Sequence, residues 1–263
     1  MSLRNFPWWL LALATLWAVG LWRILASEIS AQILETLLRG VGGTLFVTAI
    51  AFSAACLLGL VLALGLIAEH PLPRNLARIY VELIRGLPVL VLLLYVAFVL
   101  APGMIWAWNA LAEPLAGPSL RTRDFPLLWR AILALTLGYG AFLAEVFRAG
   151  LQSVDPGQIE AAKALGLQPR HRFRLIILPQ ALRTILPPLG NDFVAMVKDS
   201  SLVSVLGVLD ITQLGKVTAA ANFRYFETYN VVAFLYLTLT ISLSLALGRL
   251  EARLRRLPKG KGA

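Results

Sequence analysis

The chain is divided into long apolar runs separated by shorter polar segments. About twenty apolar residues in a helix match the roughly 30 Å hydrocarbon core of a bilayer, and a helix satisfies its own backbone hydrogen bonds in lipid. The pattern therefore predicts an all-α polytopic membrane protein with six transmembrane helices. The runs cover residues 7–26, 41–68, 87–105, 127–147, 181–215 and 229–248.

The first two runs carry further signals. Residues 7–26 are rich in tryptophan and lack a small-x-small cleavage site in a polar context, so they predict a retained anchor helix rather than a removed signal peptide. Residues 27–40 are amphipathic and are expected to lie at the membrane interface. In the second run, Gly59 and Gly65 predict that neighbouring helices approach closely.

The connections around the third run are of two kinds. Residues 69–86 carry prolines and charges that end the second run, and Pro88 lies where the next helix starts, so its missing N–H does little harm. Residues 106–126 contain tryptophans and prolines and predict an interfacial loop. We expect an N-terminal anchor helix and interfacial segment over 1–40, a main transmembrane domain over 41–250 and a basic tail over 251–263.

The fifth run differs from the others because it contains prolines, glycines and charged residues, which a single straight helix facing lipid would not tolerate. A charge in the middle of a membrane costs roughly 2.5–3.5 kcal/mol and is expected to pair or to line a cavity. One interpretation is that Lys198 and Asp199 pair near the membrane edge. The other is that the polar residues line a path for a zwitterionic solute. The candidate path residues are Asn191, Asp192, Lys198, Asp199, Ser200 and Ser201.

Residues 145–180 form the longest polar interruption, EVFRAGLQSVDPGQIEAAKALGLQPRHRFRLIILPQ. Good helix formers predict one short helix over 156–166, capped by Asp155, and another over 170–178. Gly166 predicts the stop between them. The small side chains around Ala161 would let the backbone of a partner approach. This stretch therefore predicts a docking surface rather than a catalytic site.

Composition and charge support a membrane protein and exclude several other classes. The chain has 263 residues, 59% of them hydrophobic and 14% charged, whereas soluble domains are roughly 45–50% apolar and about 25% charged. The net charge of +10 lies in short segments between apolar runs, which favours membrane topology over nucleic-acid binding. By the positive-inside rule, both termini, residues 69–86 and residues 148–183 are expected in the cytoplasm.

Signals for chemistry in this chain are weak. Gly215-Lys216-Val217 does not complete a phosphate-binding loop, so we expect ATP to be bound elsewhere. Cys56 is the only cysteine and lies in an apolar run, which excludes a disulfide framework and a cysteine-based metal site. His70 and His171 lie in basic segments and fit solvated loop residues. No nucleophile, metal-ligand set or carboxylate pair indicates an enzyme.

Several spaced motifs resemble the permease subunits of bacterial ABC importers for polar amino acids. The pattern Glu160-Ala161-Ala162, Gly166 and Ile176-x-Leu178-Pro179 is similar to the EAA loop of that family. The segments ELIRGLP over 82–88, EVFRAG over 145–150 and KDSSL over 198–202 fit the same group. Together these motifs cover residues 40–250.

The resemblance implies a five-helix type I core plus one N-terminal helix, with a cytoplasmic coupling helix between spans 4 and 5. It implies two ABC ATPase subunits that hold ATP and Mg²⁺, a second permease subunit and an extracytoplasmic amino-acid-binding protein, all around a non-catalytic chain in the inner membrane that binds no cofactor or nucleic acid. A secondary transporter or channel that works without an ATPase is the alternative, but it leaves the polar loop unexplained. The implied coupling residues are Glu160, Ala161, Ala162, Lys163, Gly166, Ile176, Leu178 and Pro179.

Overall fold

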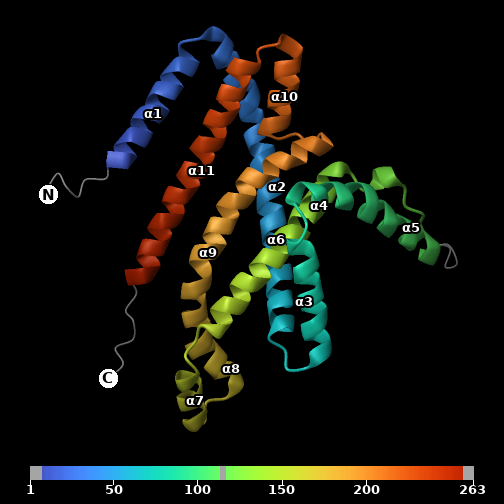
Figure 1. The fold of residues 1–263 in the computed structure, drawn as a ribbon, viewed down its shortest axis with the longest axis vertical. Helices are drawn as coiled ribbons and strands as arrows, with labels where there is room; N and C mark the ends of the chain where they lie inside the picture. The colour runs from blue at the N-terminus through green and yellow to red at the C-terminus, as the bar shows by residue number, and fades with distance from the viewer. Residues whose placement is uncertain (1–7, 113–116, 257–263) are drawn as a thin grey trace.

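The computed structural model describes residues 8–112 and 117–256, and within these ranges the chain forms helices and no strand. The long helices cross one another in an elongated bundle (Figure 1). The α1–α2 turn and α10 lie at one end of the bundle, and α7 and α8 lie at the other end. The long elements are α1 (Trp8–Leu25), α2 (Glu28–Leu66), α6 (Leu127–Gln152), α9 (Leu178–Asp199) and α11 (Tyr225–Arg256).

Membrane-length helices account for most of this bundle. Among the described residues, four stretches are long and apolar enough to span a bilayer: Glu28–Leu66, Val89–Ala112, Leu127–Gln152 and Tyr225–Leu250. The predicted all-helical membrane fold is therefore confirmed. The count of six spans also requires α1, which is apolar but shorter, and α9, which carries the polar residues; that count stays a prediction.

The segment over 27–40 is the first part of α2, so the second helix starts well before residue 41. Ser27 caps α2, and the helix then continues without a break for 39 residues. Ile33 and Leu37 are buried in a cluster with Ile211 and Val231, so the apolar face of this segment packs against α10 and α11. Its place at the membrane interface stays a prediction.

The core of the bundle lies where α2 crosses α6. A Cβ atom on Gly59 would lie 2.8 Å from Cβ of Leu143, and one on Gly140 would lie 2.7 Å from Cδ2 of Leu58. Gly65 is similarly close to α3 (Pro71–Arg85), since a Cβ atom there would lie 3.0 Å from Cβ of Ala77. The predicted role of Gly59 and Gly65 in close packing is confirmed.

The linker over 69–86 is the helix α3, and it is anchored to α6 through Tyr80. The Tyr80 hydroxyl donates to the carbonyl of Leu137 at 2.9 Å, and burial raises the pKa of Tyr80 to about 12, so the donor stays protonated. The third run follows as α4 (Val89–Tyr95), η2 (Val96–Leu100) and α5 (Ala101–Ala112). Because α5 extends to Ala112, the interfacial loop predicted from residue 106 begins later. Over residues 117–126 it contains only the short turn η4 (Thr122–Asp124).

The fifth run is interrupted, but not where its prolines suggested. Pro187 and Pro188 lie inside α9, which continues to Asp199. The chain turns instead through η6 (Ser200–Leu206) and Gly207, whose φ of +74° favours glycine, before α10 (Ile211–Asn222) begins. The polar residues therefore lie in the last turns of α9 and the start of η6.

Candidate transport path and coupling surface

The predicted pair of short helices is present at the end of α6. In α7 (Pro156–Ala164), the Asp155 carboxylate accepts a hydrogen bond from the Gly157 N–H at 2.8 Å, as expected for a cap. Gly166 has a φ of +73°, and the Leu167 N–H donates to the Ala162 carbonyl at 3.1 Å, which closes the helix. The second helix is α8 (Pro169–Arg172) followed by η5 (Phe173–Ile177), which runs on into α9.

The helix α7 is attached to the bundle on one face. Ile159 packs against a cluster formed by Val154, Ala181 and Ile185. The Gln180 side-chain amide donates to Gln158 Oε1 at 2.6 Å, which joins α7 to the start of α9. These contacts fix the position of α7 relative to both helices that flank it.

The candidate coupling residues divide between the two faces of this loop. Ala162 is 2% exposed, so it does not belong to the exposed surface of the loop. Leu165 is 80% exposed at the tip, although the sequence did not single it out. Ile176 and Leu178 are half-buried at the junction with α9, and Pro179, which follows Leu178, is exposed. The exposed members on α7 and its end are Glu160, Ala161, Lys163 and Gly166.

The candidate path residues do not form one cluster. Asn191 and Lys198 are exposed, whereas Ser200 is buried and donates to the Val197 carbonyl at 2.8 Å. The Asp199 carboxylate accepts a hydrogen bond from the Tyr139 hydroxyl at 2.8 Å. Among the described residues, no ion pair joins Lys198 to Asp199, so the interpretation that they pair is wrong: α6 supplies the partner of Asp199.

A second group of buried polar side chains is centred on Asp210, and the sequence analysis did not predict it. Asp210 is 0% exposed; its carboxylate accepts from the Gln213 N–H at 2.7 Å and from the Tyr236 hydroxyl at 3.0 Å. The Tyr236 hydroxyl also lies 3.0 Å from Thr212 Oγ1. Asp210 followed by Gln213 has the spacing of a helix N-terminus, so capping rules could have found it.

The backbone beside Asp210 explains two glycines of α2. A Cβ atom on Gly43 would lie 2.1 Å from the carbonyl oxygen of Leu209, and one on Gly40 would lie 2.7 Å from the Asp210 backbone. The Ile211 N–H donates to Thr44 Oγ1 at 3.4 Å. The turn before α10 is therefore seated directly on α2, and the Asp210 network fixes α10 between α2 and α11.

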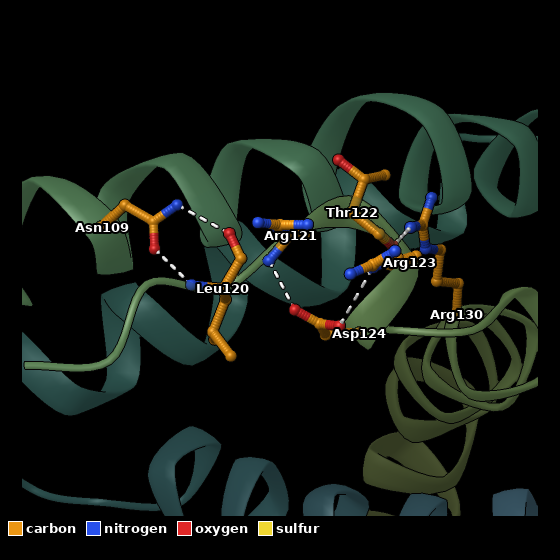
Figure 2. Close-up of polar contacts among 7 residues, drawn as sticks. All are labelled: Asn109, Leu120, Arg121, Thr122, Arg123, Asp124 and Arg130. Carbon is orange, nitrogen blue, oxygen red and sulfur yellow. Dashed lines mark hydrogen bonds and ion pairs between the residues drawn. The ribbon is translucent and has the colours of Figure 1, made fainter.

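Arg130 is the other functional candidate that sequence reasoning counted only as a charge. Its guanidinium is buried, donating to the carbonyls of Phe125 at 2.7 Å and Ala97 at 2.9 Å, and also to that of Thr122 (Figure 2). These contacts hold the loop before α6 against η2. An arginine near the start of an apolar run was the available signal.

Comparison with known proteins places this geometry in a family. The family model described as "Binding-protein-dependent transport system inner membrane component" matches residues 55–256. The probable amino-acid permease protein YxeN of Bacillus subtilis is 38% identical over 210 residues, which cover 80% of this chain and 87% of that protein. The glutamine transport system permease protein GlnP of Escherichia coli K12 is 34% identical over 219 residues, covering 83% and 93%.

Solved structures agree with these relatives. A crystal structure of an amino acid ABC transporter with histidines superposes with a TM-score of 0.70 at 34% identity, covering 85% of this chain and 96% of that one. An inward-facing structure of the MetNI methionine ABC transporter shares the fold, with a TM-score of 0.64 at 22% identity and coverage of 87% and 99%. The relatives do not favour the alternative of a transporter without an ATPase. The chain belongs to the family of inner membrane permease components of binding-protein-dependent ABC transport systems.

Proposed function

We propose that the chain forms the translocation path of an ATP-driven importer of polar L-amino acids and that α7 is the helix through which ATPase subunits drive it. The observation that carries the proposal is the way α7 is attached to the bundle. It is a capped helix with one buried face and an exposed end, and it contacts both α6 and α9. Relatives named for amino-acid and glutamine transport support the substrate class.

The contacts of α7 suggest how movement would reach the membrane. Ser153 Oγ donates to the Gly150 carbonyl and lies 3.1 Å from Thr184 Oγ1, so the end of α6 is also joined to α9. Further along the same two helices, Tyr139 of α6 binds Asp199 of α9. A partner that shifts α7 would therefore shift both helices that carry this polar pair.

The polar end of α9 is the part of the path that we assign to substrate. Placing carboxylates and hydroxyls inside a membrane costs free energy unless they pair or line a cavity. Asp199 has such a partner, because its carboxylate accepts a hydrogen bond from the Tyr139 hydroxyl. The exposed side chains of Asn191 and Lys198 would face the space between two permease subunits. The proposed path residues are Asn191, Asp192, Lys198, Asp199, Ser200 and Ser201.

The assembly and topology follow from the same proposal. Two permease subunits, identical or related, would enclose the path, and two ATPase subunits holding ATP and Mg²⁺ would bind the two α7 loops. With α7 in the cytoplasm, both termini and the basic tail over 251–263 lie on that side, with residues 1–40 as an added anchor before the transport domain over 41–250. The opposite end would receive the extracytoplasmic binding protein.

The test is a loop variant in the full complex. E160Q/G166A removes an exposed charge and puts a Cβ atom at a φ of +73°, where side chains are strained. We expect the variant to insert normally but to lose co-purifying ATPase and ATP-dependent uptake. Q168A, an exposed change in the same loop, is the matched control. Normal ATPase recovery and uptake in E160Q/G166A would rule out the coupling assignment.

A further inference from the structure

The loop opposite α7 is rigid and carries an excess of positive charge. We call residues 117–126, which contain η4, the η4 loop. It precedes α6, and α7 follows α6, so a helix of 26 residues, about 39 Å long at 1.5 Å per residue, separates the two loops. With α7 in the cytoplasm, the η4 loop lies at the extracytoplasmic end.

Three sets of hydrogen bonds hold the η4 loop in place (Figure 2). The side-chain amide of Asn109 donates to the Leu120 carbonyl and accepts from the Leu120 N–H, both at 2.8 Å. The Arg121 N–H donates to Asp124 Oδ2 at 2.7 Å. The Arg130 guanidinium, from the first turn of α6, donates to the carbonyls of Thr122 and Phe125. The loop is thus ordered before any partner arrives, which lowers the entropy cost of binding.

The charges on this loop are not balanced. Arg121 and Arg123 are both exposed. Among the described residues the only ion pair that either makes is between Arg123 Nε and Asp124, at 3.9 Å, and the Asp124 carboxylate also accepts from the Arg121 N–H. Arg224, at the junction of α10 and α11, has its own partner in Glu227 at 3.6 Å. Arginines are normally depleted on the extracytoplasmic side, so an exposed pair with a single carboxylate indicates an acidic partner.

Beside the arginines lies a hollow of about 270 Å³ between α5 and the loop. Its walls include Met104, Trp108 and Phe125, with Arg121 and Asp124 at its rim. Trp108 is fixed by a hydrogen bond from Nε1 to the Pro118 carbonyl at 3.2 Å. An apolar hollow lined by tryptophan and bordered by arginine has the composition of a protein-binding hot spot.

We propose that the η4 loop is a docking surface for an acidic patch on the extracytoplasmic binding protein, with Arg121 and Arg123 steering its approach and the hollow receiving an apolar side chain. The proposal rests on the proposed function, because it requires a binding protein at this end. Exposed charges at the rim of an interface act mainly on the association rate and on its salt dependence.

The experiment uses the complete importer in nanodiscs and the purified amino-acid-binding protein encoded with it. We expect R121Q/R123Q to lower the association rate constant about three- to tenfold at low salt and to flatten its salt dependence, with basal ATPase activity unchanged. R224Q, which neutralises one arginine at the α10–α11 junction outside the η4 loop, should bind like the wild type. N109A keeps the charges but loosens the loop, so it should weaken binding and preserve the salt dependence.

The outcomes separate this proposal from its basis. If R121Q/R123Q binds with wild-type rate and salt dependence, the docking surface is wrong although the importer function stands. If the effect occurs in nanodiscs containing phosphatidylglycerol but not in those of phosphatidylcholine alone, the arginines bind lipid headgroups and the proposal is also wrong. If the wild-type importer neither binds the protein nor is stimulated by it, the proposed function itself fails.

Discussion

Gly150 lies where α6 and α9 approach each other next to the coupling loop, and its substitution provides a quantitative test. A Cβ atom on Gly150 would lie 2.1 Å from Cγ1 and 2.8 Å from Cδ1 of Ile185, and 3.3 Å from the carbonyl oxygen of Ala181. Ile185 is buried and branched at Cβ, so Cγ1 cannot move away by a simple change of the terminal torsion. The two helices must therefore separate by about 1 Å or more to regain normal contact distances.

The size of the effect follows from two opposed contributions. Overpacking of a filled core costs about 1–3 kcal/mol, while glycine to alanine in a helix contributes about 1 kcal/mol of stabilisation. We expect G150A to be destabilised by about 0–2 kcal/mol and to lose a larger share of its transport, because the shift occurs between the helices that hold α7. Thermal unfolding of the purified complex and uptake in proteoliposomes measure the two effects.

Ile185 provides the matched second change. I185A alone removes buried methyl groups and should cost about 2–5 kcal/mol, but in G150A/I185A the new methyl group enters the vacated space. The double variant should thus be more stable than the sum of the single effects by about 1 kcal/mol or more. G42A, inside α2 and with nothing within 4 Å of its Cβ atom, is the control and should show only the helix stabilisation of about 1 kcal/mol. Additive losses, or a G150A variant with normal transport, would refute the close contact of α6 and α9.

Three further changes test the buried polar contacts. R130K keeps the charge but loses the guanidinium that donates to three carbonyls, so the free energy of unfolding should fall by about 1–3 kcal/mol and protease cleavage within the η4 loop should increase. Unchanged cleavage would contradict the anchoring role. D210A removes a helix cap and a buried acceptor, so thermal unfolding should show a loss of about 1–3 kcal/mol in the free energy of unfolding, and D210N should lose clearly less. Equal losses in the two variants would argue against the cap. Y139F keeps the ring but frees Asp199, and it should change the concentration of amino acid needed for half-maximal uptake without changing ATPase recovery; a loss of ATPase subunits instead would place Tyr139 in assembly.

Local signals predicted the parts of the molecule that depend on a few neighbouring residues. The apolar runs gave the helices, Asp155 and Gly166 gave the limits of α7, and Gly59 marked a close helix crossing; each depends on membrane thickness, capping or backbone geometry alone. The helix over 156–166 was placed to within a turn. These features need no knowledge of the rest of the fold.

The features that sequence reasoning missed depend on distant partners. Residues 27–40 become part of α2 because Ile33 and Leu37 are covered by α10 and α11, which lie far along the chain. Asp199 accepts a hydrogen bond from Tyr139 of another helix, and among the described residues it forms no ion pair with Lys198, its neighbour in sequence. Arg130 uses backbone carbonyls, which a residue pattern does not reveal. Such pairings become visible only when the helices are placed in space.

The most direct measurement is uptake of a labelled polar amino acid into proteoliposomes, with and without the partner subunits. The chain reconstituted with its partner permease, ATPase and binding protein should accumulate the amino acid only when ATP is supplied on the ATPase side. The chain alone should show no accumulation. Accumulation by the chain alone, without ATP, would contradict its assignment as the permease subunit of an ATP-driven importer.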